Sequence, residues 1–406
     1  MRVLYLTPGV PADGVVGGPM GSLYNILQLV EAGHEVTALC LVPRDCPDLD
    51  EGKVSRLATL RVVRDAGMSS PASFASNLVD PLPWPIRRYA SRSYARTVRE
   101  TLHANGFDLV FFNSLHSATM LPLVRDLTDA PCVLFEHNVQ ATIMELFARV
   151  QRNPFARAYA WLQWCKTLAF ERRAIARFDL VLTFSDVDSR HLAALRPGIA
   201  VRSVPLKLDL TRFAAAGAVE NELSDLLFVA YFGWAPNEDS LRWFVEGIMP
   251  LILARRPGTT LDIVGAGARE WVRALDGRDG VIRFLGRVDD VAPHYRRARV
   301  VVVPLRVGSG VRVKIVQAMA AARAIVTTTK GCEGLDVRSG EHLAVADSPE
   351  EFAAATVRLL DDPAERKRLG ERARVLALAR HDALGADKPI ARECEELVRR
   401  SRGGRP

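Results

Sequence analysis

The stretch Val300–Thr328 reads VVVVPLRVGSGVRVKIVQAMAAARAIVTT. An apolar run at Val300–Pro304 predicts a strand, and the glycine-rich turn Val307–Gly310 follows it. A helical pattern then occupies Val311–Ala322, and a second strand is predicted at Ala324–Thr328. A strand, a turn, a helix and a strand in this order form a βαβ unit with parallel strands. Strands that are apolar throughout are typical of a parallel sheet that is buried on both faces.

The same alternation extends outward from this stretch in both directions. Further strands are predicted at Arg2–Leu6, Glu35–Cys40, Thr59–Val63, Leu109–Phe112, Cys132–Glu136, Leu180–Phe184, Leu226–Phe232, Leu261–Val264, Val281–Leu285 and Leu343–Ala346. Helical patterns occupy Met20–Glu31, Asp239–Arg255, Asp290–Arg299, Pro349–Arg380 and Leu384–Arg400. The fold class is therefore α/β.

Residues Pro197–Ala218 break this rhythm and are predicted to be an interdomain linker. Two doubly wound, Rossmann-like domains follow from this division, at residues 1–205 and 206–383, with a C-terminal helix at about 384–401 packing back on the first domain. Ligands of open parallel sheets bind at the carboxyl ends of the strands. We therefore expect the two domains to face each other across a cleft that holds the site.

Composition is that of an ordinary globular protein. The 406 residues are 49% hydrophobic and 25% charged, which excludes a disordered, collagenous or coiled-coil chain. The first residues predict a buried strand rather than a signal peptide, and the six scattered cysteines are typical of reduced thiols, so we expect a cytoplasmic protein. The net charge of +7 gathers partly in Trp84–Arg99 and Phe155–Arg177. Solvated helix faces and peripheral contact with the inner face of a membrane both remain open for these stretches.

The turn before the helix at Val311 is the strongest candidate for binding chemistry. Gly308, Ser309 and Gly310 allow a ligand to approach the backbone, and the first N–H groups of a helix attract phosphate. Val311, Arg312 and Lys314 continue this turn and add two positive charges. The segment predicts a diphosphate cradle, although a Gly-Ser-Gly sequence before a helix is often only a turn.

Three other positions lie where a site is expected. Gly17 and Gly18 belong to a loop between the first strand and the first helix, which could contact a phosphate or a sugar or could simply be flexible. His137 and Asn138 follow the strand Cys132–Glu136, and His116 follows Leu109–Phe112, so all three sit at strand carboxyl ends. Structural hydrogen bonding is the alternative for both histidines. No metal-ligand motif is found.

Several of these segments together resemble one family. Gly33-His34-Glu35-Val36, Glu136-His137-Asn138, the strand Phe178–Ser185, the segment Gly233–Asp239 and the block Gly308–Val337 are similar to motifs of the retaining, metal-independent GT-B glycosyltransferases of family 4, in the same order. The resemblance spans almost the whole chain. It implies a GT-B fold and transfer of a sugar from a nucleotide sugar to a small-molecule or lipid-linked acceptor. It implies no cofactor and no metal, and no role in nucleic-acid binding is expected.

The resemblance also implies a role for each candidate residue. The diphosphate would meet Arg312 and Lys314, and His137 would lie near the donor sugar and the acceptor. The rest of the donor would contact Gly233, Asn237, Gly286, Arg287, Val288, Gly308, Ser309, Gly310, Val311 and Gln317. The acceptor side would use Gly17, Gly18, His116 and Asn138.

Two departures from the family pattern leave alternatives open. Gln317 stands where the family has a ribose-binding glutamate, and Tyr231–Pro236 lacks the family's basic pair. A catalytically impaired GT-B protein that binds nucleotide sugars would fit these changes. A GT-B nucleotide-sugar epimerase is a further alternative, although the expected site is poor in carboxylates.

Overall fold

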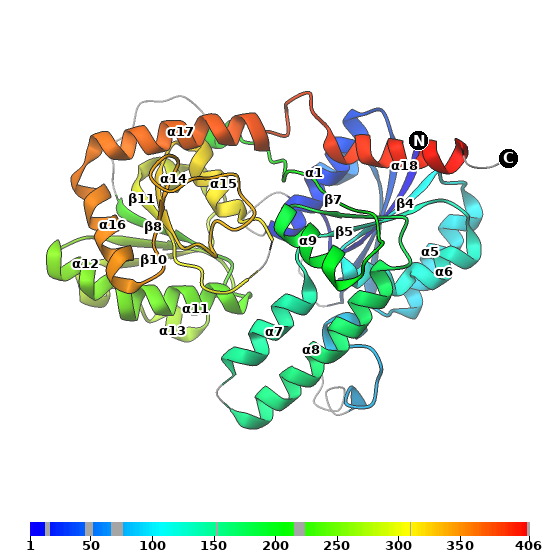
Figure 1. Cartoon of the computed structure of the whole chain (residues 1–406), viewed down its shortest axis with the longest axis horizontal. Helices are drawn as coiled ribbons and strands as arrows, with labels where there is room; N and C mark the ends of the chain where they lie inside the picture. The colour runs from blue at the N-terminus through cyan, green and yellow to red at the C-terminus, as the bar shows by residue number, and fades with distance from the viewer. Residues whose placement is uncertain are drawn as a thin grey trace. The chain divides into compact units, whose positions relative to one another are not determined.

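The computed structural model describes residues 1–12, 17–44, 52–65, 76–151, 153–214, 224–308 and 310–403 (Figure 1). The chain divides into two compact units, each built on one parallel sheet. Unit 1 comprises Met1–Asp13, Gly18–Leu206 and Gly385–Pro406, and unit 2 comprises Gly14–Gly17 and Lys207–Leu384. The main divisions follow residues 206 and 384, next to those expected after residues 205 and 383.

The sheet of unit 1 has seven strands in the order β3-β2-β1-β4-β5-β6-β7, and every pair is parallel. The strands are β1 (Arg2–Pro8), β2 (Glu35–Pro43), β3 (Thr59–Asp65), β4 (Leu109–Asn113), β5 (Cys132–Glu136), β6 (Leu180–Thr183) and β7 (Val201–Ser203). β4 and β5 are buried at every position, as expected for central strands covered on both faces. The rings of Tyr5, Phe111 and Phe135 stack from β1 across β4 to β5.

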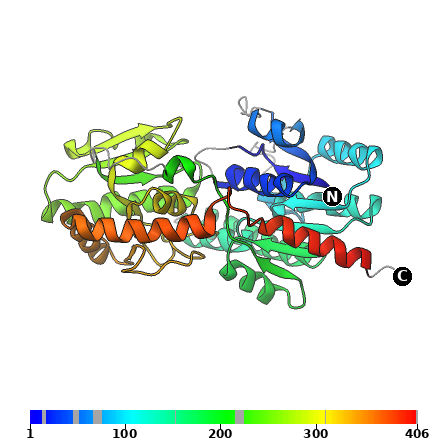
Figure 2. The same ribbon diagram turned by 90° about the horizontal axis from the view of Figure 1, so that it is seen from above.

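Helices flank this sheet (Figure 1). They are α1 (Gly17–Glu31), α2 (Gly52–Leu57), α4 (Trp84–Arg87), α5 (Arg92–Ala104), η1 (Leu115–Met120), α6 (Leu121–Leu127), α7 (Gln140–Val150), α8 (Pro154–Ile175), α9 (Asp186–Leu195) and α18 (Pro389–Gly403). Figure 2 shows α18, in red, beside α1, in dark blue. The Ile390 amide donates to Gln28 Oε1 at 3.2 Å, and Lys388 pairs with Glu31. These contacts attach the last helix to unit 1.

The sheet of unit 2 has six parallel strands in the order β10-β9-β8-β11-β12-β13. They are β8 (Ser224–Val229), β9 (Leu261–Val264), β10 (Ile282–Gly286), β11 (Ala298–Val303), β12 (Ala324–Thr327) and β13 (Ala344–Val345). The helical segments are α10 (Thr211–Ala214), α11 (Ala235–Trp243), η2 (Phe244–Ile248), α12 (Met249–Arg255), α13 (Glu270–Arg273), η3 (Arg278–Gly280), α14 (Ala292–Arg297), α15 (Val313–Ala320), α16 (Pro349–Asp361) and α17 (Pro363–His381). Phe228, Phe232, Phe244 and Phe352 belong to the core beneath them.

One sequence prediction about the start of an element was wrong. Gly17 and Gly18 are not part of a loop, because α1 begins at Gly17 rather than at Met20. The boundary between the units after Leu206 falls within the predicted linker Pro197–Ala218, although this segment also contains β7 and α10. β7 is a three-residue edge strand with partly exposed side chains, which is too short to show an apolar pattern. It is the one strand of the described residues that the sequence did not predict.

The helix expected at Asp239–Arg255 begins earlier and is interrupted. It starts at Ala235, and a π-helical segment at Phe244–Ile248 separates α11 from α12. Pro250 lies in the first turn of α12 and has no N–H to continue the α-helical ladder. The change of hydrogen-bond pattern therefore falls just before the proline.

Within the described residues, no helix is both long and apolar enough to cross a membrane.

A substitution at Gly370 tests how closely α17 packs on the end of α15. A methyl group on Gly370 would overlap the carbonyl oxygen of Ala322, which is backbone and cannot rotate away. We expect Gly370→Ala to lower the free energy of unfolding by roughly 2 kcal/mol, because overpacking outweighs the roughly 1 kcal/mol gain in helix propensity. Gly106→Ala is the matched control, since its methyl group meets nothing within 4 Å. Urea unfolding that leaves both variants equally stable would contradict this packing.

Candidate functional site

Several candidate site residues of unit 2 lie at the edge between its two central strands, β8 and β11. The chain winds outward from β8 through β9 to β10 in one direction, and from β11 through β12 to β13 in the other. Loops that follow β8 and β11 therefore diverge, and the carboxyl edge between these strands is where an open parallel sheet binds ligands. α11 follows β8 and α15 follows β11, so both helices begin at this edge.

A hydrogen bond joins the two sides of this edge. Lys314, in the first turn of α15, donates from Nζ to Oδ1 of Asn237 at 2.9 Å. Asn237 is buried in the first turn of α11, and its Nδ2 donates to the carbonyl oxygen of Tyr231 at 2.7 Å. Lys314 Nζ also lies 5.6 Å from the centre of the Phe228 ring. Desolvation, followed by the positive charge of Arg312, lowers the pKa of Lys314 to about 7.

Arg312 lies beside Lys314 and is almost completely buried. It is 5% exposed, and its guanidinium carbon lies 5.8 Å from the centre of the Trp234 ring. Gly308 makes this packing possible. A methyl group on Gly308 would lie 2.8 Å from Arg312 Nη2 and 2.9 Å from Trp234, and the φ of Gly308 is +136°. Only glycine fits both the space and the backbone conformation.

The structure thus brings five of the predicted donor-side residues to one place. These five residues and Trp234 form what we name the switch-point cluster: Trp234, Asn237, Gly308, Gly310, Arg312 and Lys314. Gly310, with a φ of +79°, and the partly exposed Val311 complete the turn into α15. Ser309 lies outside the described residues. Among the described residues, no three His, Cys, Asp or Glu side chains are grouped as ligands for a metal ion.

Gln317 is buried on the following turn of α15. Its Oε1 lies 3.3 Å from the hydroxyl of Tyr295, which is also 3.3 Å from the Lys314 carbonyl oxygen. Complete burial of Tyr295 raises the pKa of its hydroxyl, so this group stays protonated and donates. Gln317 is 3% exposed. Its carbonyl end therefore belongs to the packing of α15 on α14.

Among the other predicted donor-side residues, the segment Gly286–Val288 lies apart from the switch-point cluster, whereas Gly233 directly precedes Trp234 of that cluster. Gly286 ends the edge strand β10 with a φ of +65°, and Arg287 follows as an exposed side chain, then Val288 as a partly exposed one. β9 lies between β10 and β8, so this segment is about 10 Å from β8 across the sheet. Gly233 lies against the ring of Tyr231, where a methyl group would overlap that ring.

The corresponding edge of unit 1 lies between β1 and β4, and Asn113 occupies it. Its Nδ2 donates to Thr7 Oγ1 at 3.1 Å and to Ser22 Oγ at 2.7 Å. Its Oδ1 lies 2.8 Å from Nε2 of His137. Asn113, Thr7 and Ser22 are all buried. These residues and His137 form what we name the His137 network.

The hydrogen bonds of this network decide which His137 nitrogen carries the proton. The Ser22 hydroxyl donates to the Gly18 carbonyl oxygen at 2.9 Å, so it accepts from Asn113 Nδ2. The oxygen of the Asn113 amide therefore faces His137, and His137 Nε2 must donate to it. Burial, followed by the charge of His116, lowers the His137 pKa to about 4. The ring is neutral at pH 7, with Nδ1 as its acceptor.

Apolar groups hold the His137 ring in place. Phe135 and Phe184 contact it edge to face, at ring-centre distances of 5.1 Å and 5.4 Å. A methyl group on Gly21 would lie 3.2 Å from His137 Cε1 and 3.3 Å from Nδ1, so α1 approaches the ring closely here. The ring orientation is therefore determined by packing as well as by the hydrogen bond to Asn113.

The remaining acceptor-side residues lie around this network. His116 is in η1, where its Nδ1 is 2.6 Å from the Ser114 hydroxyl and the Tyr89 ring contacts its edge. Burial, followed by the charge of Arg88, lowers the His116 pKa to about 4. Asn138 is partly exposed beside His137. Gly17 and Gly18 form the first turn of α1, and the Gly18 carbonyl oxygen accepts a hydrogen bond from Ser22 of the network.

Family models match most of the chain. Residues 23–206 match the model described as "Glycosyl transferase 4-like domain", and residues 224–362 match the model described as "Glycosyl transferases group 1". The chain belongs to the GT-B glycosyltransferases of family 4. The parallel sheets of the two units agree with this assignment.

Relatives of this glycosyltransferase include enzymes and uncharacterised proteins. A phosphatidyl-myo-inositol mannosyltransferase of Mycobacterium tuberculosis is 31% identical over 157 residues, which cover 37% of this chain and 42% of that protein. The match thus spans less than half of the mannosyltransferase. An uncharacterised 44.6 kDa protein from the cps region of Klebsiella pneumoniae is 20% identical over 87% of this chain and 89% of its own.

Solved structures share the fold of this glycosyltransferase. Sucrose-phosphate synthase from Thermosynechococcus elongatus superposes with a TM-score of 0.70 at 18% identity, over 100% of both chains. The Anabaena protein Alr3699/HepE, solved in complex with UDP and glucose, gives a TM-score of 0.67 at 14% identity, over 98% of this chain and 99% of that one.

Sequence reasoning missed several residues of this glycosyltransferase's candidate site. Asn113 ends β4 and could have been found by the rule that selected His137, namely a polar side chain at a strand's carboxyl end. Ser22 and Gly21 lie inside α1 and carry no local signal. Trp234 lies in the family-like segment Gly233–Asp239 but was not singled out, and Tyr295 carries no local signal; their contacts with Arg312 and Gln317 show their place in the site.

An Asn113→Asp variant tests the His137 network. A carboxylate in place of the Asn113 amide favours the charged imidazolium, so we expect the His137 pKa to rise from about 4 by at least about one unit. Titration of the His137 Cε1–H signal by NMR measures this change. His294 in unit 2 serves as the internal control and should titrate unchanged. An unaltered His137 titration would mean that Asn113 does not set the state of the ring.

Proposed function

We propose that this protein is a retaining glycosyltransferase that moves a sugar from a nucleoside diphosphate sugar to an acceptor hydroxyl without a metal ion. The observation that carries this proposal is the pair of cations, Arg312 and Lys314, at the start of α15. They lie at the carboxyl edge between β8 and β11, where a doubly wound sheet receives its ligand.

The switch-point cluster fits a departing diphosphate. Breaking the bond between the sugar and the diphosphate leaves negative charge on the phosphate oxygens. Arg312, Lys314 and the first N–H groups of α15 would stabilise this charge, which is the role of a metal ion in other transferases. Gly310 gives the turn its left-handed backbone conformation, and Gly308 lets Arg312 and Trp234 pack closely against the turn.

The His137 network fits a hydrogen-bonding role toward the sugar. A neutral imidazole with a pKa of about 4 is a weak base, so we assign the His137 ring to hydrogen-bond with a substrate hydroxyl rather than to act as a general base. The acceptor oxygen would form the new bond to the sugar carbon as the bond to the diphosphate breaks. The proton of the acceptor hydroxyl would pass to the departing diphosphate on the same face.

Two comparisons support the substrate classes. The mycobacterial relative is named for mannosyl transfer to a phosphatidyl-myo-inositol, and the Anabaena structures contain UDP, UDP-glucose, or UDP with glucose. We therefore propose a nucleoside diphosphate sugar as donor and a small-molecule or lipid-linked hydroxyl compound as acceptor. We further propose action in the cytoplasm, because the six scattered cysteines are typical of reduced thiols.

A ligand panel tests the nucleotide site. UDP, GDP, dTDP, ADP and their common sugars are compared by thermal shift in the presence of a chelator. A ligand at about 100 times its dissociation constant should stabilise the protein by about 2.7 kcal/mol. We expect one nucleotide class to do so and Arg312→Ala to abolish the shift. Arg306→Ala is the matched control, because Arg306 lies in the same loop but pairs with Asp239 at 2.8 Å.

Activity then separates the parts of the proposal. The proposal as a whole predicts that the nucleoside diphosphate is released only when the acceptor is present. It also predicts that NMR finds the donor's anomeric configuration unchanged in the product. Nucleotide binding without transfer to any acceptor would favour an impaired binding protein. An inverted anomer would overturn retention alone, and a strict requirement for added metal would overturn metal independence.

The lowered pKa of Lys314 predicts that the protein takes up a proton when it binds a nucleotide. Because its pKa is lowered to about 7, Lys314 is mostly neutral at about pH 8, and a bound diphosphate would restore its charge. Affinity should therefore fall as the pH rises through 7. Calorimetry at about pH 8 in buffers of different ionisation enthalpy should show close to one proton taken up per nucleotide. Lys314→Arg, which stays charged, should bind without this uptake, and equal uptake by both proteins would exclude Lys314 as its source.

A further inference from the structure

The helices α7 and α8 form a hairpin that leaves the sheet of unit 1 after β5 and returns before β6 (Figure 1). Its base is fixed by buried polar contacts. Glu171 on α8 accepts hydrogen bonds from the Gln140 and Ala141 amides at 2.8 Å and 3.0 Å, and so caps the start of α7. The hairpin is therefore a rigid arm rather than a loose loop.

Contacts along α8 also hold a short apolar segment against the arm. Lys166 Nζ donates to the carbonyl oxygens of Asn77, Leu78 and Asp80 at 2.6–3.0 Å. Gln163 binds the side chain of Asn77 at 2.9 Å. Leu78 and Val79 are thereby presented to solvent beside α8, with 52% and 90% of their surface exposed.

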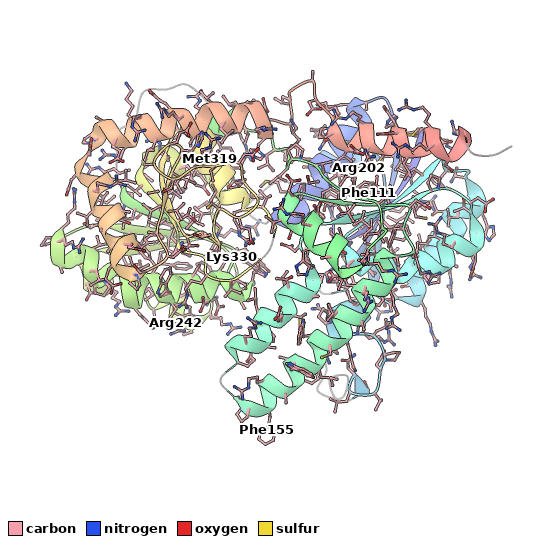
Figure 3. The ribbon with its side chains drawn as sticks, viewed as in Figure 1. Phe111, Phe155, Arg202, Arg242, Met319 and Lys330 are labelled. Carbon is pink, nitrogen blue, oxygen red and sulfur yellow. The ribbon has the colours of Figure 1, made fainter. Side chains whose placement is uncertain are left out.

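The arm carries an unusual share of exposed apolar surface. Phe155 is 85% exposed, Trp161 57% and Phe147 42%. With Leu78 and Val79, these are five of the eleven large apolar side chains that are exposed in the described part of the chain. Phe155 stands at the outer end of the hairpin and points away from it (Figure 3). A concentration of exposed apolar side chains on and beside one hairpin indicates an interaction surface.

Basic residues outnumber acidic ones in the segment that carries most of these side chains. The 31 residues from Phe147 to Arg177 contain seven Lys and Arg and a single acidic residue, Glu171. Glu171 is completely buried at the base of the hairpin. Arg149 and Arg157 line the hollow beside Trp161 and Trp164, where Glu145 pairs with Arg149 at 2.5 Å. Of these basic residues, Arg149 and Arg157 lie beside the exposed aromatic side chains, whereas Arg172, Arg173 and Arg177 lie near Glu171 at the base of the hairpin.

We propose that the outer end of the α7–α8 hairpin docks on the surface of a bilayer that contains anionic lipids. Aromatic rings favour the boundary between headgroups and acyl chains, and arginines beside them attract anionic headgroups. The other aromatic and basic stretch expected from sequence, Trp84–Arg99, is a poorer surface. There, Tyr89 packs on His116 and Arg87 pairs with Asp80 at 2.8 Å.

Docking of the outer end of the hairpin would turn toward the lipid the edge of unit 1 from which the hairpin rises. α7 begins at Gln140, three residues after His137, so the arm rises from the edge that carries the His137 network. That edge would then face the bilayer across the length of α7, about 16 Å at 1.5 Å per residue. The docking surface itself does not depend on the proposed sugar transfer, because the membrane contact needs neither donor nor acceptor.

Vesicle binding tests the docking surface. The full chain is incubated with large vesicles of phosphatidylcholine alone or mixed with phosphatidylglycerol, and the bound fraction is measured by co-flotation. We expect binding only to the anionic vesicles, weakening as ionic strength rises. The double variants Phe155→Ser/Trp161→Ser and Arg149→Glu/Arg157→Glu should each lower the partition coefficient by at least about tenfold.

Matched controls separate docking from general loss of apolar surface. Val375→Ser/Leu384→Ser removes exposed apolar side chains of unit 2, which are 70% and 55% exposed, and should bind like the wild type. Thermal unfolding shows whether each variant is folded. Equal binding to neutral and anionic vesicles, or unchanged binding by the hairpin variants, would overturn the proposal. So would a wild-type dimer that Phe155→Ser/Trp161→Ser dissociates without vesicle binding, since the surface would then join two copies.

Discussion

In each unit the chain winds outward in opposite directions from two neighbouring central strands. The position of the polar site residues depends on this reversal. Parallel strands covered on both faces leave little room for buried charge except at their carboxyl edge. Between β1 and β4, and again between β8 and β11, the following loops diverge and open that edge. Asn113 and Lys314 occupy these two places, and each is held by side chains from the opposite side of the divergence.

Burial acts on the two clusters with different results. It lowers the pKa of His137 to about 4 and that of Lys314 to about 7. The imidazole is therefore neutral at pH 7, and its hydrogen bonds are directional. Lys314 is balanced between charged and neutral forms, so an arriving anion can change its state. Arg312 remains a cation when buried because its guanidinium does not lose its proton in proteins. The His137 network is suited to orienting hydroxyl groups, and the switch-point cluster is suited to receiving negative charge.

The α7–α8 hairpin departs most from the plain alternation of strands and helices. A connection from β5 to the adjacent parallel strand β6 needs only one helix to cross back over the sheet. Here the chain uses two helices, and the outer parts of both lie beyond the sheet (Figure 1). The buried Glu171 and the Lys166 contacts stabilise this arrangement, so the exposed aromatic side chains are displayed on a fixed support.

The sequence alone determined the parallel α/β class, twelve of the thirteen described strands, and the position of Gly308–Lys314 and His137 at strand ends. These features follow from hydrophobic patterns and turn residues, which are local. Only the tertiary structure decided that Asn237 meets Lys314 across 77 residues, that Asn113 meets His137, and that Gln317 packs against Tyr295. It also decided which aromatic residues of α8 are exposed. Strand order sets these contacts, and burial sets the pKa values, so neither can be read from neighbouring residues in the chain.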